Sequence, residues 1–405
     1  MKINIGYTAG RKAAVVDTEK AMNPHILCIG ASGSGKTVEA QHIISDIVRQ
    51  GGTVLAVSMH GSLAANQIFG DCAEDFERYG NHIYADRTGI TCPLFTPLTY
   101  PDGSVETEID MTGAIADIIC RSLKLRRTER TLLRKAVERV AQEGTYHCDG
   151  FRAIGDVLCS MGKSKGAELY EQLRPLLSRN IFTHGESFLM EGCMNIIHLD
   201  RLDLWLQNAV VEILLSYVWR LGNASQFEER GIYLFLDECQ NVNTRPDGAL
   251  ASMLSEGRKM GIRLILATQM ILRGSTSSVQ ERLTQCGTIL IFKPAADGIT
   301  QTAKIIDPAG SRQWYERLRI LKVGEFVACG TFVIAGMTID YPVVVSNRMY
   351  DKELVDGRTA AKCTEMTFVK WGNQDDILLR GSHIMNQRKD GGDSFEGQKY
   401  LPQVL

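Results

Sequence analysis

The sequence predicts an α/β protein with a mostly parallel central sheet and an inserted all-α subdomain. Three observations support this fold class. An apolar run at residues 26–29 leads into a glycine-rich loop and then a helical pattern. Strand-like runs alternate with helical segments again after residue 195, as in a parallel sheet whose strands are connected by helices. Between these two regions, residues 106–185 are mostly helical in pattern.

Composition is that of an ordinary globular protein. Hydrophobic residues make up 44% of the 405 residues and charged residues 23%, which excludes collagen, coiled-coil and largely disordered chains. The length predicts two or three domains, or one large domain with an insertion. There are 45 Lys and Arg against 47 Asp and Glu, a net charge of −2, so any nucleic-acid site must be local.

The lack of a targeting pattern and the spacing of the cysteines predict a cytoplasmic protein. The sequence shows no signal-peptide pattern after Met1 and no run of about 18 apolar residues, so we expect any membrane role to need a partner. The eleven cysteines occur singly, without a C-x-x-C pair. This spacing favours reduced core residues over a zinc or disulfide framework.

The first part of the core is predicted from a strand, a loop, a helix and a second strand. The helix after the loop has apolar residues at three- and four-residue spacing: Ala40, Ile43, Ile44 and Ile47. Gly51 and Gly52 end this helix, and Thr53–Ser58 reads as the next strand.

The remaining elements are predicted in the same way. Helical periodicity places inserted helices at 108–123, 129–142 and 166–178, and later helices at 204–221 and 248–260. Core strands are expected at 195–199, 231–236, 263–267 and 288–292. A small antiparallel set is expected at 325–329, 331–335 and 343–345.

These elements predict four regions. Residues 1–100 and 191–350 form the two parts of the core, and residues 101–190 form the inserted helical subdomain. Residues 351–405 form a C-terminal extension. Its tail from about residue 386 is poor in apolar residues, so we expect it to be mobile.

The glycine-rich loop matches the P-loop pattern Gly30-x-x-x-x-Gly35-Lys36-Thr37. Glycines let backbone N–H groups turn toward a phosphate, and Lys36 would reach the terminal phosphates while Thr37 would bind Mg²⁺. The alternative is an accidental Gly/Ser-rich turn, which the flanking strand and helix disfavour. The predicted nucleotide-binding residues are Gly30, Ser32, Gly33, Ser34, Gly35, Lys36 and Thr37.

A second acidic element follows the apolar strand that ends at Leu236. Asp237 and Glu238 would lie at the carboxyl edge of a parallel sheet, beside the phosphate loop. We expect Asp237 to hold Mg²⁺ and Glu238 to act as the general base that activates water. An acidic pair at a helix N-terminus is the alternative, and the P-loop in the same chain argues against it.

Gln269 ends the next apolar strand, where it would lie near the γ-phosphate and sense hydrolysis. A simple strand-end cap is the alternative. Arg258 and Arg263 flank the turn before this strand, and an arginine presented to a neighbouring subunit's nucleotide can neutralise transition-state charge. We choose Arg258 for this role, and weaker candidates are Arg282, Arg312 and Arg317.

The combination resembles the HerA/FtsK superfamily of P-loop ATPases. Four passages carry the resemblance, which covers residues 20–70 and 195–345. They are Asn23-Pro24-His25-Ile26-Leu27-Cys28-Ile29, Leu236-Asp237-Glu238, Ser255-Glu256-Gly257-Arg258-Lys259-Met260-Gly261 and Leu266-Ala267-Thr268-Gln269. The resemblance implies a RecA-like core, a hexameric ring and movement of DNA, or in some secretion systems protein, through a central pore.

The resemblance also implies roles for individual residues. Lys36 and Thr37 match the Walker A motif, Asp237 and Glu238 match Walker B, and Gln269 matches the sensor glutamine. Arg258 resembles the trans-acting arginine of the conjugation and type IV secretion ATPases, the coupling-protein or TraG/VirB-like branch, which we favour.

Two features depart from the family pattern. The second strand ends Ser58-Met59-His60-Gly61, where many members have an Asp. The amino-terminal spanning helices of anchored coupling proteins are absent from this sequence. The role of that Asp is therefore not carried over to this chain.

Two segments are candidates for substrate contact. Residues 121–139 hold eight basic residues and two acidic ones, a net charge of +6, which suits a phosphate backbone or a solvated helix face. Residues 271–278, with Arg273, would face the centre of a ring or form an ordinary connection.

The sequence therefore predicts an ATP- and Mg²⁺-dependent motor that translocates DNA in conjugative transfer or a related type IV secretion process. We expect a homo-hexamer that is cytoplasmic, or peripheral at the inner face of the membrane on a secretion or conjugation complex. The alternatives are a secretion ATPase acting on protein and a nucleotide-gated assembly or scaffold protein.

Overall fold

The computed structural model describes residues 1–347 apart from 162–163, 228–230, 244–247 and 270–281. The described residues all belong to one compact unit, Met1–Met349. The predicted C-terminal extension, its tail and the segment 271–278 with Arg273 lie outside the described residues.

The strands of the main sheet run in the order β14-β13-β2-β1-β15-β12-β11-β3-β10-β9-β4-β8-β5. Their bounds are β1 (Lys2–Tyr7), β2 (Ala13–Asp17), β3 (Ile26–Ile29), β4 (Thr53–Ser58), β5 (Gly80–Tyr84), β8 (Met194–His198), β9 (Ile232–Leu236), β10 (Ile262–Thr268), β11 (Thr288–Phe292), β12 (Glu325–Gly330), β13 (Phe332–Ile334), β14 (Met337–Ile339) and β15 (Val343–Ser346). A separate pair contains β6 (Ile90–Thr91) and β7 (Phe182–Thr183).

The part of the sheet from β11 to β5 is parallel throughout. Its strands are short apolar runs, and β3, β4, β8, β9 and β11 are buried along their whole length, as expected for strands covered on both faces. Because these strands are parallel, their carboxyl ends share one edge, and the loops that follow them lie close together.

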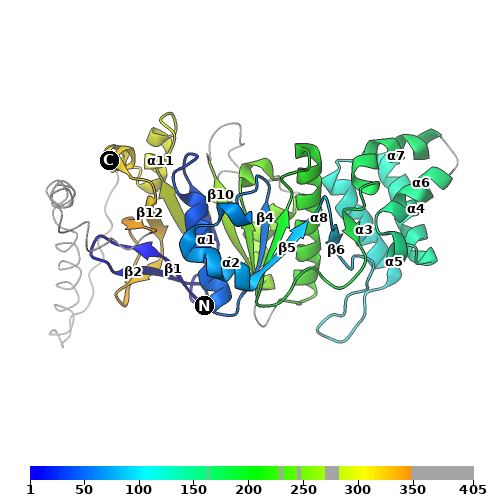
Figure 1. The fold of residues 1–405 in the computed structure, drawn as a ribbon, viewed down its shortest axis with the longest axis horizontal. Helices are drawn as coiled ribbons and strands as arrows, with labels where there is room; N and C mark the ends of the chain where they lie inside the picture. Colours follow the sequence, from blue (N-terminus) through cyan, green and yellow to red (C-terminus); the bar gives the residue numbers. More distant parts are fainter. Residues whose placement is uncertain (162–163, 228–230, 244–247, 270–281, 348–405) are drawn as a thin grey trace, which may run out of the picture. The chain divides into compact units, whose positions relative to one another are not determined.

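Helices cover both faces of the parallel strands (Figure 1). Helices α1 (Lys36–Arg49) and α2 (Ala73–Tyr79) pack on one face, where Ile43 and Ile44 join Ile26 and Cys28 in one apolar cluster. Helices α8 (Leu204–Asn223) and α9 (Ala249–Glu256) lie in the cluster that contains Leu27 and Ile29 on the other face. The single apolar stripe of α1 and the alternating inward faces of β3 explain this division.

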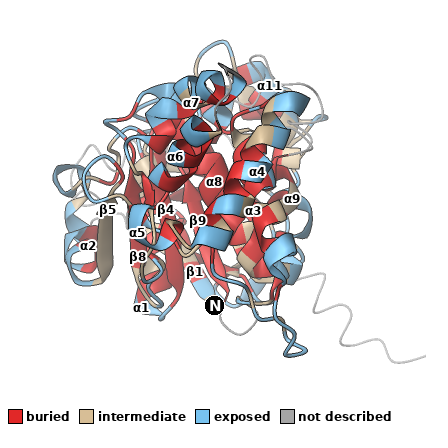
Figure 2. Ribbon diagram, turned by 90° about the vertical axis from the view of Figure 1, so that its right-hand side faces the viewer, coloured by how far each residue is buried: buried red, intermediate tan, exposed pale blue. Residues whose placement is uncertain are grey.

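The inserted helices form an outer layer over α8, and they include two short helices, α5 and α6, in addition to the three that the sequence predicted. Their bounds are α3 (Glu108–Ser122), α4 (Arg127–Glu143), α5 (Tyr146–Asp149), α6 (Arg152–Ser160) and α7 (Ser164–Leu177). Helix α3 packs on α8, α4 packs on α3, and α6 lies between α4 and α7. Helix α8 is therefore enclosed, and Figure 2 shows it buried, whereas α4 presents exposed residues on its outer side.

The last segments complete the described chain. Helices α11 (Ile299–Ile306) and α12 (Ser311–Ile320) follow β11 and contact each other. Single 3-10 turns are η1 (Ala65–Gln67), η2 (Gly70–Cys72), η3 (Cys239–Asn241) and η4 (Gly257–Met260).

The fold class predicted from sequence is confirmed, and the predicted antiparallel strands are present as β12, β13 and β15. They continue the main sheet, because β12 pairs with β11 and β15, and β15 pairs with β1. The amino-terminal strands β1 and β2, which the sequence analysis did not predict, supply the missing partners. The predicted helix 248–260 ends at Glu256, and Gly257–Met260 tightens into a 3-10 turn before Gly261 at φ 72°.

Candidate nucleotide-binding site

The phosphate loop leaves β3 between two neighbouring strands that hold it. The Gly30 backbone N–H donates to the Thr268 carbonyl at 3.2 Å, and the Ala31 N–H donates to the Lys293 carbonyl at 2.9 Å. Gly35, at φ 105°, precedes the first residue of α1 and adopts a backbone conformation that favours glycine. The loop is therefore fixed at both strands and turns directly into a helix N-terminus, where backbone N–H groups are free to bind an anion.

Lys36 is held inside this loop. Its side chain is buried, and Nζ donates to the Gly30 carbonyl at 2.8 Å and to the Ala31 carbonyl at 3.0 Å. Burial lowers the pKa of Lys36, while the nearby charges of Glu238 and Asp237 oppose that shift. The ammonium group thus lies close to both carboxylates and is bound by carbonyls that a phosphate would replace.

The loop fits a phosphate in two further respects. Ser34 Oγ is buried and has no hydrogen-bond partner among the described residues, so it is an orphaned polar atom inside the loop. A Cβ at Gly30 would lie 2.6 Å from the Phe292 Cβ atom and 2.9 Å from Ser34 Oγ, which explains the glycine there. Gly33, in contrast, faces open space. Ser32 is exposed and Thr37 is partly buried at the start of α1.

A second segment supports the loop from behind, and the sequence analysis did not anticipate it. The Gly324 N–H donates to the Ser34 carbonyl at 3.0 Å, and the Asn347 N–H donates to the Gly324 carbonyl at 2.9 Å. A Cβ at Gly35 would lie 2.9 Å from the Gly324 nitrogen. No spacing in the sequence indicates this contact, because it joins residues about 290 positions apart.

The acidic pair lies at the carboxyl end of β9. Asp237 is 6% exposed, and burial raises its pKa, with the neighbouring Glu238 charge adding to the rise. The Glu238 N–H donates to Asp237 Oδ1 at 3.0 Å. Glu238 itself has φ 53°, a left-handed conformation that is uncommon for residues other than glycine and clusters at functional sites.

Gln269 reaches Glu238 from the adjacent strand β10. Its Nε2 donates to Glu238 Oε1 at 2.7 Å. Gln240, which the sequence analysis did not single out, donates to the second carboxylate oxygen of Glu238, and its Oε1 accepts from Thr268 Oγ1 at 2.8 Å. The amides of Gln269 and Gln240 therefore fix both oxygens of Glu238. Gln240 also connects Glu238 to Thr268 of β10, the strand beside the phosphate loop.

The structure brings the predicted site residues together with one exception. Arg258 lies in η4, at the amino end of β10 and so at the opposite edge of the sheet from Gln269. It is exposed, and its guanidinium donates to the Met22 carbonyl. Arg263 instead lies 5.2 Å from the Tyr233 ring centroid. Arg258 therefore does not approach the phosphate loop of its own chain.

The predicted basic segment is exposed along α4 and the turn before it. Two of its arginines are paired, Arg134 with Asp117 at 3.8 Å and Arg139 with Glu143 at 2.6 Å. Over the described residues, no group of three or more His, Cys, Asp or Glu side chains is arranged to hold a metal ion. None of the described helices is long and apolar enough to cross a membrane.

Comparisons with known proteins were made by sequence and by structure. No protein-family model matches the chain. The probable helicase MJ1565 of Methanocaldococcus jannaschii is 22% identical over 386 residues, which cover 86% of this chain and 67% of that protein.

Solved structures give the clearer likeness. VirB4 of Thermoanaerobacter pseudethanolicus matches with a TM-score of 0.61 at 16% identity, over 86% of this chain and 97% of that one. The plasmid coupling protein TrwB in complex with ADP and Mg²⁺ matches with a TM-score of 0.55 at 14% identity, over 87% of this chain and 90% of that one.

At these identities the likeness establishes the fold. The fold expected from the resemblance inferred from the sequence is thereby confirmed: this chain shares its fold with VirB4 and with the coupling protein TrwB, which are among its structural neighbours.

Proposed function

We propose that this protein is an ATP-hydrolysing motor that translocates DNA in conjugative transfer or a related type IV secretion process. The observation that carries the proposal is the meeting of Lys36, Glu238 and Gln269 at one edge of a sheet with this fold. A P-loop lysine beside a carboxylate held by an amide is the arrangement that nucleotide hydrolysis needs.

The phosphate loop binds the nucleotide in this proposal. Backbone N–H groups of Gly30–Thr37 bind the phosphates, and Lys36 exchanges its loop carbonyls for terminal phosphate oxygens. Thr37 and Asp237 hold Mg²⁺, for which their oxygens are suitable ligands. The bound metal ion supplies positive charge that neutralises the phosphate oxygens.

Glu238 is the proposed general base. Its two oxygens are fixed by Gln269 and Gln240, so the carboxylate is oriented before the substrate arrives. Gln269 also ends the strand whose Thr268 carbonyl holds the phosphate loop, which allows it to couple the state of the nucleotide to β10 and the segment that follows.

Arg258 acts in trans in this account. Its exposed position at the amino edge of the sheet suits contact with a neighbouring subunit's nucleotide and excludes contact with its own. This geometry supports a ring, which we propose is a homo-hexamer. In it, residues 1–100 and 191–350 form the ATPase core and residues 101–190 form the helical subdomain.

DNA is the proposed polymer, and the cytoplasmic side of a membrane complex the proposed place of action. The support is the fold shared with TrwB, described as a bacterial conjugative coupling protein, and the exposed basic segment 121–139. A secretion ATPase acting on protein, or a nucleotide-gated scaffold, would turn over ATP without responding to DNA.

Two variants test the nucleotide chemistry. We expect Lys36→Ala to abolish ATP binding, and Glu238→Gln to bind ATP while its hydrolysis rate falls about 100-fold or more, because a positioned general base contributes 10²–10⁴-fold. Binding is measured with a fluorescent ATP analogue and hydrolysis by phosphate release.

Glu77→Gln, an exposed change on α2, serves as the matched control and should hydrolyse ATP like the wild type. Full hydrolysis by Glu238→Gln would contradict the assignment of the base.

A further inference from the structure

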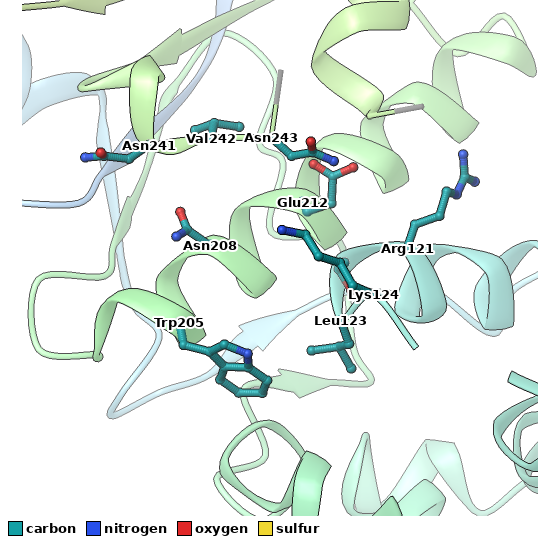
Figure 3. A pocket seen from close by; sticks show the side chains of 10 residues that line it. Arg121, Leu123, Lys124, Trp205, Asn208, Glu212, Asn241, Val242 and Asn243 are labelled. Carbon is teal, nitrogen blue, oxygen red and sulfur yellow. The ribbon is translucent and has the colours of Figure 1, made fainter. Parts of the chain in front are cut away.

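A cavity of about 350 Å³ lies beside the nucleotide site, between the end of α3, the first turns of α8 and the segment after η3. It is lined by two cations, an indole and three amides: Arg121, Lys124, Trp205, Asn208, Asn241 and Asn243. Figure 3 shows Lys124 reaching across the cavity toward α8, with Trp205 on one side and Asn243 near Glu212 on another. Nothing in the proposed hydrolysis uses these side chains.

The side chains that line the cavity are exposed at its mouth and buried at its base. The Trp205 residue is 43% exposed although it is a large apolar side chain. Asn208 Oδ1 is shielded from solvent and has no hydrogen-bond partner among the described residues. Glu212, at the base of the cavity, is buried and accepts a hydrogen bond from the Ala249 N–H at 3.2 Å.

Lys124 is held in an unusual conformation. Its φ is 53°, in the left-handed region, at the turn between α3 and α4. The conformation caps the end of α3: the Leu125 N–H donates to the Cys120 carbonyl at 3.2 Å and the Lys124 N–H donates to the Arg121 carbonyl at 3.3 Å. A glycine would adopt it at lower cost. Its ammonium group has no hydrogen-bond or ion-pair partner among the described residues, and it points into the cavity (Figure 3).

We propose that this cavity binds a nucleotide of single-stranded nucleic acid. A base stacks on the Trp205 indole, the amides of Asn208 and Asn243 bind its edge, and Lys124 and Arg121 bind the flanking phosphates. The inference rests on the proposed function, because it names where a DNA motor of this fold takes hold of its strand.

Chemistry favours a nucleotide over an acidic peptide. Both would satisfy the two cations, but only a base provides a flat ring for Trp205 and polar edges for the amides. The buried Glu212 carboxylate disfavours an anion deep in the cavity, which places the phosphates at the cations and the uncharged base inside.

The cavity is also connected to hydrolysis. Asn241 ends η3, which begins directly after Glu238, and Gln240 within η3 binds both Glu238 and Thr268. A base that moves Asn241 therefore acts on a turn that orients the proposed general base. This connection gives a strand in the cavity a direct route to the hydrolysis rate.

The test measures binding of fluorescein-labelled dT20 to the full chain by fluorescence anisotropy, without ATP. We expect Trp205→Ala to weaken binding about tenfold, and Trp205→Phe to weaken it less because the ring is kept. We expect Lys124→Gly to reduce the slope of log K against log salt by about 0.7, the share of one phosphate contact on a single strand. Lys124→Gly should also unfold at the same or a higher temperature, because it relieves the positive φ.

Lys135→Gln is the charge-matched control, since Lys135 is exposed on α4 and does not line the cavity. It should change the affinity less than twofold. Equal losses in Lys124→Gly and Lys135→Gln, unchanged binding in Trp205→Ala, or no binding of dT20 by the wild type would each overturn the proposal. If the wild type still hydrolyses ATP when one of these results is obtained, the strand-binding proposal fails while the proposed nucleotide site is retained. Failure of the cavity proposal is thus distinguishable from failure of the proposed function.

Discussion

His25 shows how one buried side chain can set the acid stability of the nucleotide-binding core. It immediately precedes β3 and is 2% exposed, and its Nδ1 accepts a hydrogen bond from the Leu264 N–H of β10 at 3.1 Å. Burial lowers the pKa of His25 to about 4. The neutral ring therefore connects the start of β3, the strand that leads into the phosphate loop, to β10.

This shift predicts a loss of stability in acid. Since the unfolded chain binds a proton near pH 6.5 and the folded chain only near pH 4, stability is complete above pH 6.5 and falls as the pH drops toward 4, by up to about 3 kcal/mol. His25→Asn keeps an acceptor without the titration, so its free energy of unfolding should change less between pH 6.5 and 4. Denaturant unfolding at a series of pH values measures this.

His60→Asn, an exposed change, is the control and should keep the wild-type slope. An unchanged slope in His25→Asn would show that other groups dominate the acid response.

At the residue scale, the sequence predicted the groups that belong to short motifs. Lys36 and Thr37 are placed by the P-loop spacing, and Asp237 and Glu238 by the apolar strand before them. Gln240 and Asn347 were not predicted, because their roles come from contacts across distant segments that leave no local pattern. The positive φ angles at Glu238 and Lys124 were not predicted either, since neither residue type indicates a left-handed backbone conformation.

At the scale of elements, the turn before β12 is a support for the phosphate loop. Gly324 has φ 83°, and a Cβ there would lie 2.4 Å from Asn347 Oδ1. Gly324→Ala should therefore destabilise the fold by about 1–2 kcal/mol and also weaken ATP binding, because the Gly324 N–H holds the Ser34 carbonyl. Thermal unfolding and ATP titration of the same variant check both effects.

Gly51→Ala separates backbone strain from contact with the loop. Gly51 has φ 77° with nothing within 4 Å of its Cβ position, and it lies at the far end of α1. The Gly51→Ala substitution should lower the unfolding temperature but leave the ATP affinity unchanged. Equal ATP affinities in both variants would contradict the supporting role of Gly324.

Core elements were predictable because strong periodicity and burial coincide in them. Strand β4 has the predicted bounds Thr53–Ser58, and β11 has the predicted bounds Thr288–Phe292. Strands β1 and β2 were missed since they lie toward the antiparallel end of the sheet, where partial exposure dilutes the apolar run. Pairing between β1 and β15 joins residues near both ends of the described chain, which no local signal encodes.

At the scale of the whole molecule, the proposed nucleotide site and the proposed strand-binding cavity lie near the same edge of the sheet. The phosphate loop and Glu238 lie where β3 and β9 end, and the cavity beside Trp205 lies where the turn after Glu238 meets the helical layer. Helix α8 is enclosed between sheet and helical layer, so a continuous set of packed side chains connects the two sides. This arrangement suits a motor in which a polymer changes the rate of hydrolysis.

The most direct test of this account is the steady-state rate of ATP hydrolysis by the purified wild type with and without single- and double-stranded DNA. We predict that DNA raises the rate severalfold, and that Glu238→Gln shows neither the basal rate nor the increase. A rate that is the same with and without either form of DNA would contradict the DNA motor and favour a protein-secreting ATPase or a nucleotide-gated scaffold.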